Sequence, residues 1–438
     1  MPDEKQLEKK QKTDSERLAA AFSKEGKPDK KPEEMAEAVE KVNKKSGKNE
    51  GEVTNKKWLV FLLIGIFGIL GGIGCILAIF LIPKETLPDL VFPQIPSSTE
   101  TSDKIYSDLT GLELASAEQK TAPAFCIQTP NGNDGARPHS GLVDAGVVFE
   151  AIAEAGITRF AAIYQNQTQA VIGPIRSLRM YYLQWDTPFD CVIVHAGGAP
   201  DALEAVKNGY KDLTENYSYM YRGNRAARRW NNLFTTSQHL NQVAADRGWG
   251  TSNIKGFNRM TPAESARSRI DTTVREKLNI VAPATANTSE LVPKTTHMTF
   301  DYAGSPTFDV IYDYDAGSNT YRRSYGNGEA HTSYVCPTDD QGEKNPEDIC
   351  SLQQVSPSVV VAMIVEEHRA SDNYHEAITT TGSGDAYIFQ NGIAIKGKWN
   401  KNTVQDQITF TDENGAEVKL APGQTFISAV PNYGSIAY

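Results

Sequence analysis

One uninterrupted hydrophobic segment dominates the pattern of apolar and polar positions along this 438-residue chain. It begins at Trp58, ends at Ile82 and contains 25 residues without a charge, which is about 37 Å of helix at about 1.5 Å per residue. That length crosses the hydrocarbon core of a bilayer with some tilt, and a soluble core has no need for a helix that is apolar on every side. Residues 58–82 are therefore predicted to form a transmembrane helix.

Shorter patterns in residues 122–290 alternate between strand and helix. Strands are predicted for the apolar runs PAFCIQ, ITRFAAIYQ and FDCVIVHAG. Helices are predicted for DAGVVFEAIAEAG, with Asp144 as N-cap and Gly156 as the stop, for the segment after Pro174, and for APDALEAVKNG. Alternation of strands with helices is typical of an α/β layer.

From about Thr295 the pattern changes to β-branched and aromatic runs. Strands are predicted for THMTFDYA, FDVIYDYD, TYRRSYG, SVVVAMIVEEH and TFISAVP, and the pairs Asn391-Gly392 and Asn414-Gly415 predict tight hairpins between further strands. This half is expected to be a mostly antiparallel sheet. The predicted fold class is therefore α+β, with an α/β layer followed by a mostly antiparallel β domain, after one transmembrane helix.

The segments that flank the hydrophobic helix differ in composition. The 57 residues before it hold 15 basic and 13 acidic residues and few large apolar ones, so they are predicted to be a disordered tail. The segment after it is rich in Pro, Ser, Thr and acidic residues, which is typical of a tether. The expected organisation is a cytoplasmic tail at 1–57, a transmembrane signal anchor at 58–82, an extracytoplasmic tether at 83–121, an α/β domain at 122–290 and a β-rich domain at 291–438.

The basic residues also orient the helix in the membrane. Lys56 and Lys57 border it on one side, and Lys84 is the only basic residue in the 20 positions on the other side. The positive-inside rule therefore places the N-terminus in the cytoplasm and residues 83–438 outside. The chain beyond residue 57 carries 29 basic and 41 acidic residues, a net charge of −12, which disfavours nucleic acid as a partner.

Two features of the helix concern its pairing and its attachment. Gly68 and Gly72 form a GxxxG pattern, which predicts a homodimer through this helix, with helix flexibility as the alternative explanation. Gly72-Ile73-Gly74-Cys75 is similar to a lipobox, but Gly72 stands where Leu is expected and the apolar run continues beyond Cys75. An uncleaved signal anchor is favoured, because the leader and the apolar run are also too long for a cleaved signal peptide. Lipidation of Cys75 stays open.

Four cysteines lie beyond the hydrophobic helix, namely Cys126, Cys191, Cys336 and Cys350. An even number in an oxidising compartment suggests two disulfides, with three connectivities to choose from. Cys126–Cys191 is favoured, because both residues lie in short apolar runs that are predicted to be neighbouring strands. Cys336–Cys350 would then close a polar loop, and free buried thiols are the alternative.

The polar residues that are candidates for ligand binding or catalysis are concentrated between residues 136 and 240. GPIRSLR places Arg176 and Arg179 on one face of the first turns of a predicted helix, where the helix dipole disfavours cations. On the preceding predicted helix, Glu150 and Glu154 also share a face. Either these glutamates neutralise the arginines in a buried ion network, or the arginines hold an external phosphate or carboxylate. The candidate ligand-binding residues are Arg137, His139, Glu150, Glu154, Arg159, Arg176, Arg179, His195, Gly197 and Gly198.

Other patterns restrict the chemistry. The glycines of HAGGAP would let the backbone approach a ligand closely at the end of a strand. His195, just before them, is a candidate acid–base partner for one of the two glutamates, with a structural histidine as the alternative. GxSxG, HExxH and phosphate-loop motifs do not occur, and neither a cofactor nor a metal is expected. Arg222, Arg225 and Arg229 are predicted to follow one helical face, either as solvated surface or as a contact for an anionic envelope polymer.

Three separated stretches, ARPHSGLVDAGVVFEAIAEAGITRFAAIYQ, IGPIRSLRMYY and FDCVIVHAGGAP, occur in an order that resembles the YerB-like family of extracytoplasmic bacterial (lipo)proteins, an uncharacterised domain family. NNLFTTSQHL, YRRSYGNGEAH and GSGDAYIFQNGIAIKGKW resemble its later motifs, so the resemblance covers residues 122–438. It implies an α+β fold with a β-rich C-terminal domain and a role in the cell envelope, without an established reaction. The chain departs from the family pattern at Gln128, His139 and Asn231, and in having a helix rather than a lipid as its anchor.

The expected function is that of a membrane-anchored extracytoplasmic protein of the bacterial cell envelope that binds a ligand or partner and recognises an anionic group. Its expected partners are the membrane, through residues 58–82, and a cell-wall component or an envelope protein. The alternative is an envelope hydrolase that uses glutamate and histidine for acid–base chemistry. The sequence leaves open whether any reaction is catalysed.

Overall fold

The structure, a computed structural model, describes residues 104–224, 230–269, 295–337 and 343–438. The predicted tail and transmembrane helix, most of the predicted tether and the predicted domain boundary near residue 290 lie outside these residues. The chain divides into two units, Met1–Glu100 and Thr101–Tyr438, and all described residues belong to the second. Within the described part of the chain, no helix is both long and apolar enough to cross a membrane.

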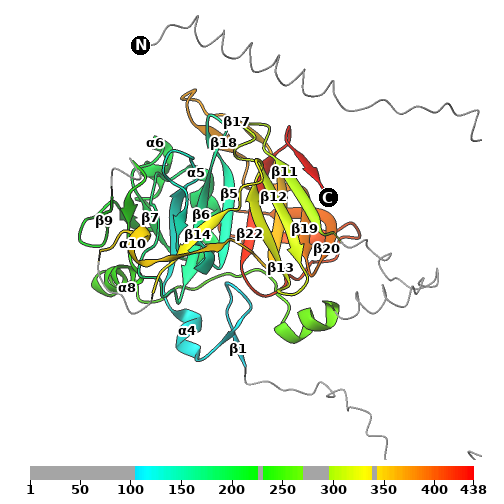
Figure 1. Ribbon diagram of the computed structural model, residues 1–438, viewed down its shortest axis with the longest axis horizontal. Coiled ribbons are helices and arrows are strands. Elements are labelled where there is room, and N and C mark those ends of the chain that lie inside the picture. Colours follow the sequence, from blue (N-terminus) through cyan, green and yellow to red (C-terminus); the bar gives the residue numbers. More distant parts are fainter. Residues whose placement is uncertain (1–103, 225–229, 270–294, 338–342) are drawn as a thin grey trace, which may run out of the picture. The chain divides into compact units, whose positions relative to one another are not determined.

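One sheet of ten strands runs through the second unit (Figure 1). Its strands in spatial order are β21 (Thr409–Asp412), β20 (Ile393–Lys401), β19 (Gly382–Gln390), β16 (Val359–Val365), β22 (Thr425–Pro431), β5 (Val147–Glu154), β6 (Ile157–Gln165), β3 (Ala124–Pro130), β7 (Val192–His195) and β8 (Lys211–Thr214). The N-terminal and C-terminal sets of strands meet where β22 pairs in parallel with β5, with Val147 opposite Thr425. Strands of the predicted α/β domain and of the predicted β-rich domain therefore form a single sheet.

Strand β5 corrects the prediction of a helix that begins at Asp144. A short 3-10 turn, η2 (Leu142–Asp144), precedes the strand, and the chain then turns at Ala155 and Gly156 into β6. Seven of the eight β5 residues are buried, because the sheet is covered on both faces. Such a strand is apolar at nearly every position and lacks the alternation that identifies a half-buried strand, so its sequence resembles that of a buried helix.

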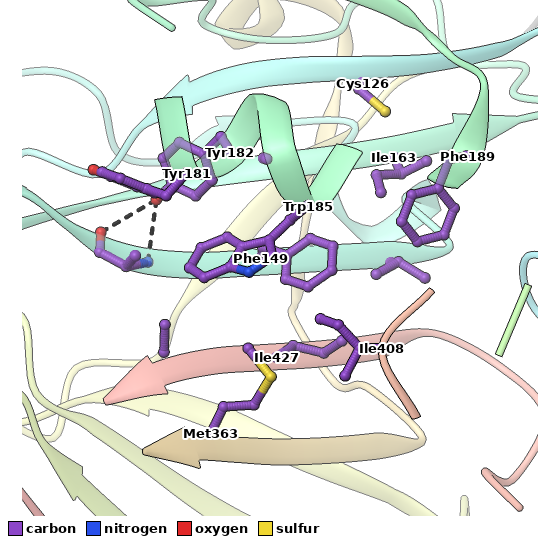
Figure 2. Close-up of a cluster of buried hydrophobic side chains, with 14 of the residues drawn as sticks. Cys126, Phe149, Ile163, Tyr181, Tyr182, Trp185, Phe189, Met363, Ile408 and Ile427 are labelled. Atoms are coloured by element: carbon purple, nitrogen blue, oxygen red, sulfur yellow. Dashed lines mark hydrogen bonds between the residues drawn. The ribbon is translucent and has the colours of Figure 1, made fainter. Parts of the chain in front are cut away.

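Short helices cover one face of the sheet. α5 (Met180–Asp186) continues into the 3-10 helix η3 (Thr187–Phe189), and α6 (Pro200–Ala205) confirms the helix predicted in APDALEAVKNG. Trp185 of α5 stacks on Phe149 of β5 with ring centroids 5.4 Å apart. Figure 2 shows this stack together with side chains from β16 and β22, so one apolar cluster joins the helices to strands of both halves.

The opposite face of the sheet is covered by a helix and by a second sheet (Figure 1). α8 (Ser237–Asp246) contributes Leu240 to a cluster that contains Val148 of β5. In the second sheet, Tyr312 belongs to a cluster that contains Val360 of β16. The fold is therefore β-rich with few helices and has three layers. The strands of the second sheet are, in order, β13 (Thr320–Tyr325), β12 (Val310–Asp315), β11 (His297–Asp301) and β23 (Ser435–Ala437).

Short paired strands and single helical turns complete the described fold. β4 and β14 lie in parallel and connect the two halves a second time. The remaining elements are β1 (Ile105–Tyr106) paired with β2 (Glu113–Leu114), β9 (Tyr221–Arg222) with β10 (Leu233–Phe234), β14 (Thr332–Val335) between β15 (Ser351–Gln354) and β4 (His139–Ser140), β17 (Glu367–Arg369) with β18 (Glu376–Ile378), and the helices α4 (Ala117–Thr121) and α10 (Pro346–Ile349).

The tight turns predicted in the C-terminal half are confirmed. Asn391, with φ 53°, and Gly392, with φ 78°, form a two-residue loop between β19 and β20, in the left-handed conformation that an Asn-Gly pair favours. Gly415, in the turn after β21, has φ 80°. The expectation of a mostly antiparallel sheet needs one correction, because β22 lies parallel to both β16 and β5.

Both expected disulfides are present. Cys126 of β3 is bonded to Cys191, which lies just before the neighbouring parallel strand β7, with 5.7 Å between their Cα atoms. Cys336 is bonded to Cys350 across the polar loop. The first disulfide links β3 to the start of the neighbouring strand β7 inside the core. The second links two cysteines only 14 residues apart in the sequence.

Candidate functional site

The GPIRSLR segment is extended and not helical. The helix predicted from Pro174 begins only at Met180, so the prediction that Arg176 and Arg179 share a helical face is wrong. The Gly173–Pro174 peptide bond is cis. Backbone groups of the segment bond to β3, β4, β10 and the residues just after β7 instead of to one another, which holds the chain in an extended form.

The GPIRSLR segment packs against the glycines of HAGGAP. The Leu178 N–H donates to the Gly197 carbonyl over 3.0 Å, and the Ala199 N–H donates to the Leu178 carbonyl over 3.0 Å. A Cβ atom on Gly198 would lie 3.1 Å from the Leu178 carbonyl oxygen, so a glycine permits this close approach. The close approach predicted for a ligand at Gly197 and Gly198 is made by the chain itself.

His195 is fully buried, and both of its ring nitrogens have partners. Nδ1 lies 2.8 Å from the Gly197 carbonyl oxygen, and Nε2 lies 2.9 Å from Asp212 Oδ1. Both partners are hydrogen-bond acceptors that hold the ring in one orientation. This arrangement leaves neither nitrogen available for acid–base work on a bound molecule.

Two arginines pair with one glutamate near the end of β5, and the charge of a third acts on the first of them. We call Glu154, Arg159, Arg176 and Arg179 the arginine cluster. Arg179 Nη2 lies 2.6 Å from Glu154 Oε2, and Arg159 forms an ion pair with the other carboxylate oxygen. The three paired side chains are only 15% (Glu154), 9% (Arg159) and 4% (Arg179) exposed. Burial, and after it the charge of Arg179, lower the pKa of Arg159.

A β-bulge turns Glu154 toward this cluster. The pairing of β5 with β6 shifts register between Ile152 and Glu154, and Arg159 lies opposite Ala151. Because paired residues share a face, Arg159 points to the α5 side of the sheet with Ala151, and the shift brings Glu154 to that side. Glu150 points to the opposite side. The prediction that Glu150 and Glu154 share a face is therefore wrong.

Arg176 supplies positive charge that Glu154 does not neutralise. The Nε atoms of Arg176 and Arg179 are buried and have no hydrogen-bond partner in the described part of the chain. The charge of Arg176 acts on Arg159, and its side chain is partly exposed. With three guanidinium groups and one paired carboxylate, the arginine cluster has a formal excess of two positive charges.

Glu150 belongs to a separate group on the other side of the sheet, which we call the buried network: Glu150, Arg323, His331 and His139. Arg323 Nη2 lies 2.9 Å and 2.8 Å from the two Glu150 oxygens, and both side chains are fully buried. The Thr158 hydroxyl donates to Glu150 Oε1 over 3.0 Å. Burial alone disfavours the charged guanidinium, but Glu150 and the surrounding tyrosines raise the pKa of Arg323 above its ordinary value.

A directional chain of hydrogen bonds leads from Arg323 through two histidines. Arg323 Nη1 donates to His331 Nδ1. Burial, together with Arg323, lowers the pKa of His331 well below its ordinary value, so the ring is neutral and its proton is on Nε2. That nitrogen lies 3.1 Å from His139 Nδ1, and His139 Nε2 lies 2.8 Å from the Pro130 carbonyl oxygen. Each histidine therefore accepts at Nδ1 and donates at Nε2.

Arg137 lies beside the buried network. Its Nε donates to the Asn131 carbonyl over 2.9 Å, and its Nη atoms lie 3.4 Å and 3.3 Å from the Thr307 carbonyl oxygen. The guanidinium carbon is 3.5 Å from the centroid of the Tyr325 ring. Burial lowers the pKa of Arg137. Like the buried network, Arg137 joins the first half of the fold to the second.

Sequence reasoning missed the residues of the second half that complete the buried network, above all Arg323 and His331. In β13 the buried positions are Tyr321, Arg323 and Tyr325, and they alternate with more exposed ones. An arginine in the buried phase of an alternating strand needs a buried anionic partner. The alternation in TYRRSYG is the signal that distinguishes Arg323 from its neighbour Arg322.

The remaining candidates lie elsewhere. Arg222 belongs to strand β9 and forms an ion pair with Glu215, so the prediction of an arginine face on a helix is wrong at this position. Arg225 and Arg229 lie outside the described residues. Among the residues with a described position, no three His, Cys, Asp or Glu side chains come together as a metal-ligand set.

The two halves that share the central sheet correspond to two domains of one known family. Residues 109–250 match the N-terminal domain of the family described as protein of unknown function (DUF3048), and residues 298–427 match its C-terminal domain. The chain therefore belongs to this family. The contacts of Glu150, His139 and Arg137 run between the two matched segments.

A relative from Bacillus subtilis (strain 168) is named "Putative lipoprotein YerB". It is 25% identical over 336 residues, which make up 76% of this chain and 88% of that protein. The crystal structure of the YerB protein from Bacillus subtilis has a TM-score of 0.58 at 23% identity, covering 76% of this chain and 100% of the solved chain. The fold is therefore YerB-like, and the resemblance drawn from the sequence motifs is confirmed.

Proposed function

We propose that this chain is an extracytoplasmic, membrane-attached protein of the bacterial cell envelope that binds a ligand or partner through an anionic group at the arginine cluster. The observation that carries the proposal is the excess charge of that cluster: Arg159 and Arg179 share Glu154, and the nearby Arg176 has no ion pair among the described contacts. The location is supported by the relative's designation as a lipoprotein and by two disulfides, which persist in oxidising compartments.

Attachment to the membrane has two candidate forms. The 25-residue apolar segment at 58–82 supports a signal anchor, in which GxxxG packing would pair two copies. The relative's name supports a lipid on Cys75 instead. The mass of the chain extracted from membranes distinguishes the two, because lipoprotein processing would remove the residues before Cys75.

The cluster has the chemistry to bind carboxylate or phosphate. A guanidinium group is planar and offers paired N–H donors that match the spacing of two anionic oxygens. Glu154 occupies one side of Arg159 and Arg179 and holds them in place, while Arg176 is the arginine that solvent reaches. Partial burial strengthens the attraction for an incoming anion relative to that at an open surface.

The test is binding of the full-length chain to two soluble probes that carry different anions. One probe is poly(glycerol phosphate) and the other is a cell-wall peptide whose anions are carboxylates. Arg176→Gln is expected to weaken binding of the preferred probe about tenfold, equivalent to ~1.4 kcal/mol, and added salt is expected to weaken wild-type binding. Arg322→Gln is the matched control, because this exposed arginine lies on β13 and away from the cluster.

Arg176 is the informative position because its side chain has no ion pair among the described contacts, so its replacement removes charge without stranding a buried glutamate. Equal affinity of wild type and Arg176→Gln for both probes would contradict the proposal. Weakening by Arg322→Gln to the same extent would show that the probes respond only to overall charge.

The alternative of an envelope hydrolase lacks comparable support. Glu150 is held by Arg323 in a fully buried pair, and Glu154 is held by two arginines. His195 is engaged by Asp212 and by a backbone carbonyl. Within the described ranges, no contact brings His195 to either glutamate, so the predicted acid–base pair has no geometric basis.

A further inference from the structure

A cavity of about 470 Å³ lies at the end of β5. Its walls come from four places: the β5–β6 turn, the loop after β11, the β17–β18 hairpin and the turn after β22. That volume is within the usual range for small-molecule sites, about 300–1,000 Å³. The residues that give it chemical character are Glu367, Arg369, Glu376, His368, Tyr433 and Tyr302.

Register places three charged side chains on one face of the β17–β18 hairpin. Arg369 lies opposite Glu376, and Glu367 is two residues before Arg369 on the same strand, so all three share a face. Arg369 Nη2 lies 3.5 Å from Glu376 Oε1, and Glu376 is buried whereas Arg369 is half-exposed. The charges of Arg369 and Glu376 cancel each other. Glu367, when ionised, therefore gives the cavity wall a net negative charge.

Glu367 has one oxygen bonded and one oxygen free. The Tyr433 hydroxyl donates to Oε1 over 3.0 Å. Oε2 is buried and has no hydrogen-bond partner in the described part of the chain. Burial, and after it the charge of Glu376, raise the pKa of Glu367 to about 7, against the hydrogen bond from Tyr433, which lowers it. A buried acceptor of this kind is stabilised by a donor that enters the cavity.

We propose that this cavity binds a small ligand through a protonated primary amine, with Glu367 as the carboxylate that accepts it. An ammonium group offers three N–H donors and one positive charge, and so satisfies the free oxygen and balances the charge of ionised Glu367. An anionic ligand would meet two carboxylates. A metal ion is disfavoured, since no three suitable ligands converge among the described residues.

The proposal is independent of the anion site, because no residue of the arginine cluster lines the cavity. The other titratable groups that line it are Arg369, Glu376 and His368 of the hairpin, Tyr433 after β22 and Tyr302 after β11. Of these, only Glu376 is a second carboxylate, and Arg369 is paired with it. The change of Glu367 from neutral to charged therefore decides whether the cavity has a net negative charge.

The test is calorimetric titration of the full-length chain with n-butylamine, and with n-butanol as the neutral analogue. The amine is expected to bind more tightly as the pH rises from 6 to 8, by about tenfold, because a carboxyl group with a pKa of about 7 goes from roughly one tenth to nine tenths ionised over that interval. The alcohol is expected to bind weakly at both pH values.

Two variants of cavity residues and one control variant test the proposal. Glu367→Gln is expected to abolish binding of the amine, whereas Glu366→Gln, a neighbouring exposed glutamate that does not line the cavity, is the matched control and should bind as wild type does. Tyr433→Phe removes the hydrogen bond that stabilises the ionised form, so it should move the pH midpoint of amine binding upward.

Arg176→Gln should leave amine binding unchanged, which separates this proposal from the anion site. Unfolding curves of each variant establish that it is folded. Amine binding that survives in folded Glu367→Gln, or no amine binding by the wild type at pH 8, would overturn the inference.

Discussion

Glu150 and Glu154 lie four residues apart on one strand, yet they belong to two groups with opposite properties. Glu150 points into a fully buried network, in which Arg323 balances its charge and the Thr158 hydroxyl donates a further hydrogen bond. Glu154 points to the other side of the sheet, where it is shared by arginines that outnumber it. The comparison teaches that a buried ion pair with balanced charge has a structural role. A buried group of ions with excess charge of one sign is a candidate for binding a ligand of the opposite sign.

The origin of the difference is a single register shift. Without the bulge between Ile152 and Glu154, both glutamates would point to one face, as they do in any regular strand. Because of the bulge, the Glu154 side chain points to the face of the sheet that α5 covers. Arg179, the residue just before α5, pairs with it there. One strand therefore contributes to the cohesion of the two halves and to the candidate site.

The largest effect is expected from breaking the buried network. Arg323→Gln leaves Glu150 buried without its cation and should lower the free energy of unfolding by about 3–5 kcal/mol. Denaturant unfolding of the full-length chain measures this. Arg322→Gln, on the exposed phase of the same strand, should change stability by no more than about 0.5 kcal/mol. A loss below ~1 kcal/mol for Arg323→Gln would show that Glu150 finds another partner.

An intermediate effect is expected from acidification, because the pKa of His331 is lowered in the folded state. The unfolded chain takes up a proton as the pH falls below about 6.5, while the folded chain keeps this ring neutral. Stability is therefore full above that pH and is lost below it, by up to about 1.4 kcal/mol per pH unit until the folded-state pKa is reached. Unfolding curves at pH 7.5 and 5.5 measure the slope. His331→Gln should flatten it, and an unchanged slope would exclude His331 as its source.

The smallest change in stability is expected at the arginine cluster. Glu154→Gln leaves Arg159 and Arg179 without their shared carboxylate and should cost about 1 kcal/mol. In contrast to Arg323→Gln, this variant should bind the preferred anionic probe more tightly than wild type does, by a few-fold, and the probe should restore its stability. Thermal unfolding with and without the probe checks both. Weaker binding by Glu154→Gln would mean that the glutamate orients the arginines for the ligand.

Much of the fold could be predicted wherever the local pattern matched the local environment. The half-buried strands of the C-terminal half alternate, and the Asn391-Gly392 loop has its expected form. Cys126–Cys191 is the pair that the strand pattern favoured, and Cys336–Cys350 is the pair that then remained. β5 could not be identified, because a strand buried on both faces has no alternation. GPIRSLR could not be identified either, because its backbone bonds go to β3 and to the segment after β7, and local sequence does not determine such partners.

The site was predictable in part for a similar reason. Glu154, Arg159 and Arg179 come from neighbouring segments of the chain, and of the ion network that was one of two alternatives, the pair of Glu154 with Arg179 is present. The partner of Glu150 lies 173 residues away, in a different half of the fold. No pattern within the first half could indicate it, although the buried phase of β13 marks Arg323 as a residue that needs such a partner.

The position of β22 has a consequence for how the protein reaches this fold. This strand is synthesised after the other nine strands of the ten-stranded sheet, yet it lies in the middle of that sheet between β16 and β5. Until it arrives, the first five strands have an unpaired edge at β5, and an open edge invites pairing with other chains. Closure of the sheet depends on contacts between distant parts of the sequence, which slows folding. A chain that has not yet reached β22 is therefore prone to aggregation through the open edge of β5.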